Sequence, residues 1–173
     1  YSNVKKGKFL SIILNYDPLS EPFFKWYQQL VSESLGKKSN GVIPVISTMP
    51  KDNHSLMQYF LDGPKQNFYT FFSVNEKGSA KLDNKNLLLN QKKFHKKNIN
   101  EIINAQKNAT RNVFLRKKIP FRNFTINQRS EKVIGSLFCF FILETILLGK
   151  ALNVNPYDQP SVELIKNETK KLF

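Results

Sequence analysis

The sequence predicts an α/β protein, a three-layer α/β/α sandwich around a mainly parallel sheet with a helical C-terminus. Short apolar runs rich in β-branched and aromatic residues alternate with longer stretches of helical periodicity. Strands separated by helices pair in parallel, and the crossover helices cover the faces of the sheet. The 173 residues match one domain, and a 40% hydrophobic share is enough for a core, which excludes a largely disordered chain.

The first half of the chain predicts three strands and two helices. The strands are expected at 9–14, 42–47 and 68–74. A serine, an acid and a proline at 20–22 predict the start of a helix over 21–35, which Gly36 ends. A second helix is expected over 54–61, because an Asp-Gly-Pro sequence stops it at 62–64.

The second half predicts one more strand and several helices. The polar, lysine- and asparagine-rich stretch 86–115 is weakly periodic and predicts one or two long helices beside the sheet. A fourth strand is expected at 120–126, a long apolar helix at 129–152 and an amphipathic helix at 160–172. The apolar run of the long helix is interrupted by polar residues and is shorter than the roughly 20 residues that a membrane span needs, so a buried core helix is favoured.

Composition narrows the compartment and the partners. The net charge of +14 keeps nucleic acids, membrane surfaces and anionic metabolites as candidate partners. A single cysteine, Cys139, excludes an internal disulfide framework and a multi-cysteine zinc site, and it favours a reducing compartment. The chain starts at Tyr1 rather than Met and has no signal peptide, so we expect the C-terminal piece of a longer cytoplasmic protein.

The first candidate site is a pair of polar residues near the end of the helix predicted over 21–35. Gln29 and Glu33 are four residues apart, so both side chains point the same way, one turn from each other. An amide and a carboxylate placed in this way can hold a sugar hydroxyl and take a proton beside it. An exposed helix end with ordinary polar residues explains the same spacing.

A second candidate is His54, where the second strand gives way to a helix with Asp52 or Asn53 as its cap. A histidine in the first helical turn feels the positive end of the helix dipole, which favours neutral imidazole and a role in proton transfer. A surface histidine at a helix start is the simpler alternative.

The third candidate is the segment 155–166, in which Pro160 is placed to start the last helix. Gln159 and Lys166 lie about two turns apart and could line one groove. The simpler interpretation is that Lys166 forms an ordinary intrahelical ion pair with Glu163.

The order of these motifs along the chain is more specific than any one of them. A helix with Gln-x-x-x-Glu-Ser-x-Gly-Lys is followed by Lys-Asp-Asn-His-Ser and then by Asn-Pro-Tyr-Asp-Gln-Pro-x-Val-Glu-x-x-Lys. This order resembles the C-terminal part of glucose-6-phosphate isomerases, including their second sugar-isomerase (SIS) domain. The resemblance is densest in residues 23–74 and 130–166. Two positions depart from the family pattern: Ser161 replaces a usual glycine, and Ala151 replaces a larger aliphatic residue.

The resemblance implies a role for each candidate residue. Glu33 matches the catalytic base, and Gln29 matches a glutamine that contacts the substrate. His54 matches the histidine that assists ring opening from the neighbouring subunit. Lys166 matches the lysine that acts at the ring oxygen and O1, and Gln159 matches a glutamine near the sugar phosphate.

The resemblance also implies an activity and an assembly. The expected reaction interconverts glucose 6-phosphate and fructose 6-phosphate through a cis-enediol, in a homodimer, with no metal and no cofactor. Residues 1–173 would form a single C-terminal SIS-type domain, with 159–173 as a terminal helix that carries part of the active site. The family's N-terminal domain holds the phosphate-binding loop and an arginine, so we expect the isolated chain to be nearly inactive.

Two other classes of function remain open. Ten basic residues with aromatic neighbours between positions 92 and 122 could bind a phosphodiester backbone, although no nucleic-acid motif accompanies them and a solvated basic face is favoured. A non-catalytic sugar-phosphate sensor on the same fold would need the phosphate loop rather than a carboxylate at the helix end.

Overall fold

The computed structural model describes residues 1–39, 41–76, 94 and 97–173. Four parallel strands form one sheet in the order β2-β1-β3-β4. The strands are β1 (Leu10–Asn15), β2 (Ile43–Thr48), β3 (Asn67–Val74) and β4 (Phe121–Ile126). The helices are α1 (Ser2–Lys5), α2 (Glu21–Leu35), α3 (Met57–Asp62), α4 (Ile99–Arg116), α5 (Glu131–Ala151) and α6 (Pro160–Lys171), with short 3-10 turns η1 (Pro18–Ser20) and η2 (Lys51–Asn53).

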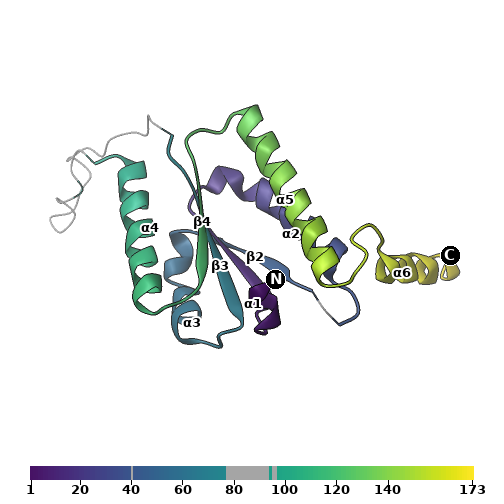
Figure 1. Ribbon diagram of the computed structural model, residues 1–173. Coiled ribbons are helices and arrows are strands. Elements are labelled where there is room, and N and C mark those ends of the chain that lie inside the picture. The colour runs from purple at the N-terminus through teal and green to yellow at the C-terminus, as the bar shows by residue number, and fades with distance from the viewer. Residues whose placement is uncertain (40, 77–93, 95–96) are drawn as a thin grey trace.

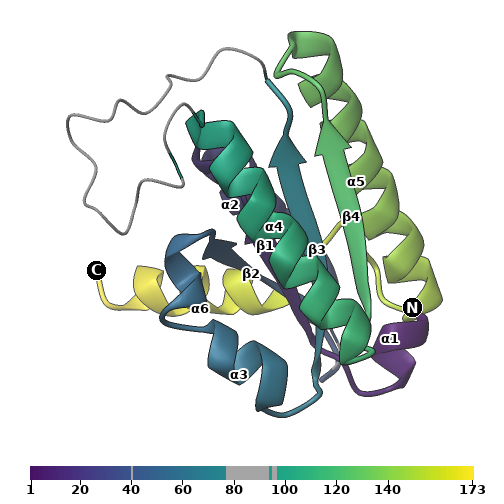
Figure 2. The same ribbon diagram turned by 90° about the vertical axis from the view of Figure 1, so that its left-hand side faces the viewer.

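Helices cover both faces of the sheet, so the predicted three-layer α/β fold is confirmed. Figures 1 and 2 show α2 and α5 on one face and α3 and α4 on the other. Alternate residues of β1 enter two separate cores, because neighbouring side chains of a strand point to opposite faces. Ile13 packs with the α2 and α5 side, whereas Ile12 and Leu14 pack with the α3 and α4 side.

The parallel register gives the sheet two chemically different edges. The first residue of β1, Leu10, pairs with Ile43 and Asn67, and its last residue, Asn15, pairs with Thr48 and Phe72. All strands therefore end at one edge, the carboxyl edge. The helix α2 starts there and runs back, so its C-terminal end lies at the opposite, amino edge, where β2 begins.

The helix predicted over 54–61 is only partly correct. The chain after β2 first forms η2, and α3 begins at Met57 and ends at Asp62. The Asp52 carboxylate accepts hydrogen bonds from the Thr48 N–H (2.8 Å) and the Ser47 hydroxyl (3.0 Å) instead of capping α3. His54 therefore follows a 3-10 turn and does not lie in the first turn of a helix.

The stretch predicted as one or two helices over 86–115 contains one described helix, α4, which starts at Ile99. A capping box begins it: the Glu101 N–H donates to the Asn98 side chain (2.8 Å), and the Glu101 carboxylate accepts from the Asn98 N–H. The rest of this prediction falls on residues 77–93 and 95–96, which lie outside the described residues.

The long apolar helix α5 forms where it is predicted, but most of its surface is not buried. Only a stripe at four-residue spacing, Leu137, Phe141, Thr145 and Gly149, is buried. Of its most apolar 18-residue window, 22% is buried. Among the described residues α5 alone is long and apolar enough to cross a membrane, a weak signal that the core helix of a soluble protein also gives. The prediction of a buried core helix is thus correct for one face only.

The last helix, α6, forms as predicted and projects away from the three layers (Figure 1). None of its residues is buried. Its position is therefore set by the segment that precedes it, because α6 has no core of its own.

Candidate active site

Glu33 lies in the last turns of α2, and two glutamine side chains bond its carboxylate. The Gln29 amide donates to Glu33 Oε1 (2.9 Å), as the four-residue spacing predicts. The Gln159 amide donates to the other oxygen, Oε2, also at 2.9 Å. Two motifs that are 126 residues apart thus meet at one carboxylate.

The cluster faces solvent at the amino edge of the sheet. The Gln28 side chain donates to the Pro44 carbonyl oxygen (2.6 Å), which fixes this part of α2 beside the beginning of β2. Glu33 is half-buried, and Gln29 and Gln159 are exposed. A carboxylate that accepts two amide donors and stays accessible can take a proton from a bound molecule.

His54 lies at the other edge of the sheet and is exposed. Its 3-10 turn is bonded to the end of β2 through Asp52, whereas Glu33 lies beyond the beginning of that strand. A six-residue strand is about 20 Å long, so His54 and Glu33 of one chain are separated by roughly that distance. Within one chain the structure does not bring the two residues together.

Lys166 is exposed on α6, and its ammonium group donates to the Glu163 carboxylate at 2.6 Å. This is the simple intrahelical pair that the spacing also predicted. In the described part of the chain neither Lys166 nor His54 contacts Glu33, so the structure unites only Gln29, Glu33 and Gln159. No group of three or more histidine, cysteine, aspartate or glutamate side chains among the described residues could hold a metal ion.

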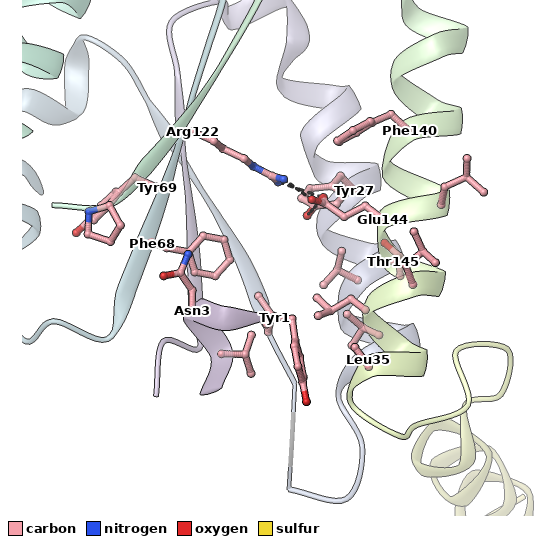
Figure 3. Close-up of a pocket in the computed structure, with 18 of the residues that line it drawn as sticks. Tyr1, Asn3, Tyr27, Leu35, Phe68, Tyr69, Arg122, Phe140, Glu144 and Thr145 are labelled. Carbon is pink, nitrogen blue, oxygen red and sulfur yellow. Dashed lines mark hydrogen bonds and ion pairs between the residues drawn. The ribbon is translucent and has the colours of Figure 1, made fainter. Parts of the chain in front are cut away.

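Sequence reasoning missed a polar cluster at a cavity of about 590 Å³ between the sheet, α2 and α5 (Figure 3). There Arg122 of β4 forms a two-armed ion pair with Glu144 of α5, and the Tyr27 hydroxyl donates to the same carboxylate (3.3 Å). Burial, followed by the charge of Glu144, raises the pKa of Tyr27. Burial lowers the pKa of Arg122, but its bonds to Glu144 and Tyr27 outweigh this and leave that pKa raised. The sequence carried one signal for this cluster: Glu144 is a charged residue within the apolar run of the long helix.

The basic stretch proposed as a nucleic-acid surface is partly engaged with the protein itself. Lys107 is buried and donates to the Ser73 hydroxyl (2.7 Å). Arg122 pairs with Glu144, and Lys117 pairs with Asp62. Positions 92, 93 and 96 lie outside the described residues. Three of the described basic side chains of this stretch are therefore engaged within the protein rather than free to bind a phosphodiester backbone.

Comparison with known proteins tests the resemblance. No protein-family model matches the chain. A glucose-6-phosphate isomerase of Methanocaldococcus jannaschii is 32% identical over 161 residues, which are 92% of this chain and 39% of that protein. A glucose-6-phosphate isomerase of Mycoplasmopsis pulmonis is 31% identical over 173 residues, covering 95% of this chain and 39% of that protein. The resemblance to glucose-6-phosphate isomerases is confirmed.

Solved structures agree on the fold. A hypothetical protein from Thermus thermophilus superposes with a TM-score of 0.88 at 24% identity, covering 97% of this chain and 42% of that one. A glucose-6-phosphate isomerase from Chlamydia trachomatis superposes with a TM-score of 0.73 at 18% identity, covering 96% and 35%. The chain spans about two-fifths of the length of the curated glucose-6-phosphate isomerases it matches.

Proposed function

We propose that this chain is the C-terminal SIS-type domain of a cytoplasmic glucose-6-phosphate isomerase that interconverts glucose 6-phosphate and fructose 6-phosphate. The observation that carries the proposal is the Glu33 carboxylate held by Gln29 and Gln159. Gln29 and Glu33 belong to the first of the motifs that resemble the family, and Gln159 belongs to the last. Proteins that match this chain in the comparison carry the isomerase name.

Glu33 is the proposed base. In the open-chain sugar its carboxylate removes the proton from C2, and the electron pair of that C–H bond forms the C1–C2 double bond of a cis-enediol while O1 gains a proton. The same proton then returns to C1, the electron pair of the double bond forms the new C–H bond, and O2 becomes the ketone oxygen as it loses its proton. One base that serves two adjacent carbons needs no change of oxidation state in the protein.

The other candidate residues act around this step. Gln29 contacts the substrate beside Glu33, and Gln159 lies toward the sugar phosphate. Lys166 and His54 assist opening of the ring at its oxygen and O1. The terminal helix 159–173 would move Lys166 over the site when α6, which has no buried residue here, packs against the rest of the enzyme.

The position of His54 supports a homodimer. In one chain His54 and Glu33 lie at opposite edges of the sheet, about 20 Å apart. Proton transfer needs hydrogen-bond reach or one bridging water. If both residues serve one site, a second copy brings its His54 to the Glu33 of the first, and a twofold assembly then has two equivalent sites.

An upstream N-terminal domain completes each site by gripping the phosphate. The length of the relatives supports such a domain, since this chain covers only 39% of them. Exposed apolar side chains of α5 give it a surface to pack against: Leu143 and Leu147 are 53% and 64% exposed, and both line the 590 Å³ cavity. By itself the 173-residue chain would then be nearly inactive.

The test is isomerase activity of the intact enzyme, with the N-terminal domain joined to these residues, beside its Glu33→Gln variant. We expect Glu33→Gln to lose about a hundredfold or more in kcat at similar KM, because the amide cannot take the proton. Glu168→Gln is the matched control, since Glu168 pairs only with Lys171 on exposed α6. Full activity of Glu33→Gln would exclude Glu33 as the base, and a folded enzyme inactive on every hexose phosphate would exclude the isomerase itself.

A further inference from the structure

Two motif residues beside the site have no role in the reaction described above. Lys37 directly follows Gly36 at the end of α2, and Asp158 directly precedes Gln159. Lys37 Nζ lies 2.7 Å from Asp158 Oδ1, and the same ammonium group donates to the Asn155 carbonyl oxygen. The ion pair and the Gln159–Glu33 bond are thus adjacent connections between the same two segments.

The ion pair differs from an ordinary surface pair in its burial. The Lys37 side chain is only 10% exposed, whereas Asp158 is 54% exposed. A shielded ammonium group needs acceptors to offset its lost hydration, and Asp158 and the Asn155 carbonyl supply them. The hydrogen bond from Lys37 lowers the pKa of Asp158, so the carboxylate stays charged down to more acidic pH.

The loop that carries Asp158 is prepared for this contact. The Asn155 amide donates to Asp158 Oδ2 (3.0 Å), and the Asn155 side-chain oxygen accepts from the Tyr157 N–H (3.1 Å). Both carboxylate oxygens of Asp158 are therefore occupied, one within the loop and one by Lys37. The carboxylate has a fixed orientation on the end of α2.

Nothing after Gln159 can hold its amide in place. The helix that follows, α6, buries no residue and projects from the molecule (Figure 1). The position of Gln159 is instead set from the preceding side, where Val154 enters the core and Pro156 packs against Gly149. Lys37–Asp158 is the last of these attachments before Gln159.

We propose that Lys37 and Asp158 are positioning residues, which clamp the loop 153–158 onto the end of α2 and so keep the Gln159 amide on the Glu33 carboxylate. The inference rests on the proposed function, because it assigns its effect to Glu33 as the base. Neither Lys37 nor Asp158 touches the substrate. Their effect on the rate is transmitted through Gln159 alone.

The test measures kcat and KM of the intact enzyme with Lys37→Met and with Asp158→Asn. We expect each variant to lose about tenfold in kcat, because the base is present but less well oriented, with a smaller rise in KM because Gln159 also lies toward the sugar phosphate. Lys25→Met is the control: it removes the same charge from an exposed lysine of α2 that makes no described side-chain bond to the loop 153–158, and it should keep full activity. Lys37→Arg should restore most of the lost rate.

A double-mutant cycle separates positioning from general destabilisation. In a Gln159→Ala background, Lys37→Met should cause no further loss of kcat, since the bond it protects is already gone. The proposal is wrong if Lys37→Met keeps full kcat, or if its loss is the same with and without Gln159. Glu33→Gln is assayed in parallel. If the Glu33→Gln enzyme is active, the proposed base is refuted. If the Glu33→Gln enzyme is inactive while Lys37→Met keeps its full rate, only the clamp is refuted. If Lys37→Met fails to fold, Asp158→Asn decides by the same cycle.

Discussion

Complementation between two inactive variants is the sharpest consequence of where His54 and Glu33 lie. The perturbation is a pair of single substitutions, Glu33→Gln in one population of the intact enzyme and His54→Ala in the other. The two side chains of one chain lie at opposite edges of the sheet, roughly 20 Å apart, far beyond the reach of a proton-transfer contact of about 3 Å. We therefore expect each working site to take its two residues from two copies.

The expected magnitude follows from counting sites. A mixed dimer has one site with both substitutions and one site with the natural Glu33 and His54. When equal amounts of the variants are dissociated and reassembled at random, half of the dimers are mixed, so about one quarter of all sites are intact. We expect the mixture to recover about a quarter of the wild-type kcat, while each variant alone stays nearly inactive.

The assay is isomerase activity before and after the two purified variants are mixed, unfolded and refolded together, with wild-type enzyme taken through the same cycle as the reference. If both residues acted within one chain, every site of the mixed dimer would carry one substitution. A refolded mixture no more active than the separate variants, beside a wild-type enzyme that regains its activity, would therefore refute the argument from the sheet edges.

Two further predictions concern stability and are measured on the 173-residue chain. Phe141 is 1% exposed and touches several rings of the core. Phe141→Ala should therefore lower the free energy of unfolding, measured by urea titration, by about 3–5 kcal/mol. The adjacent Phe140 is 43% exposed, and Phe140→Ala should lower the same free energy by only about 1 kcal/mol. Similar losses at the two positions would show that the cores are wrongly assigned. Because Lys37 lowers the pKa of Asp158 in the folded chain, this pair stabilises the fold above the ordinary aspartate pKa of about 4, and its contribution is lost as the pH falls through the lowered value. In thermal unfolding measured across the acidic range, the stability of Asp158→Asn should fall less steeply with decreasing pH than that of the wild-type chain. The same dependence of stability on pH in both chains would contradict the pairing.

The fold was predictable because local pattern and tertiary structure agree over most of the chain. Apolar runs mark the first three strands, apolar residues among polar neighbours mark the fourth, and Gly36 marks the end of α2 as expected. The prediction failed near His54 because the Asp52 side chain bonds to the end of β2 and turns the chain into a 3-10 segment before α3. Side-chain bonds of this kind compete with helix formation, and periodicity alone does not reveal them.

The candidate site was predictable only where its geometry is local. A four-residue spacing on a helix brings Gln29 to Glu33, and the structure has that bond. The bond from Gln159 joins residues 126 positions apart, and that distance in sequence carries no spacing rule. The Arg122–Glu144 pair was missed for the same reason, because each residue appears alone as a charge within an apolar element.

The two edges of the sheet explain why the described chain leaves its candidate residues so exposed. A site built within one domain would gather its acid and base groups in one hollow, with hydrophobic walls that exclude water. Here Glu33 lies at the amino edge and His54 at the carboxyl edge, and both face solvent together with Lys166 on an unpacked helix. The 590 Å³ cavity beside Arg122 is lined by none of these residues (Figure 3). We therefore expect one chain to supply halves of two sites, and assembly with a second copy and an upstream domain to create the enclosed pocket in which the carboxylate becomes a catalytic base.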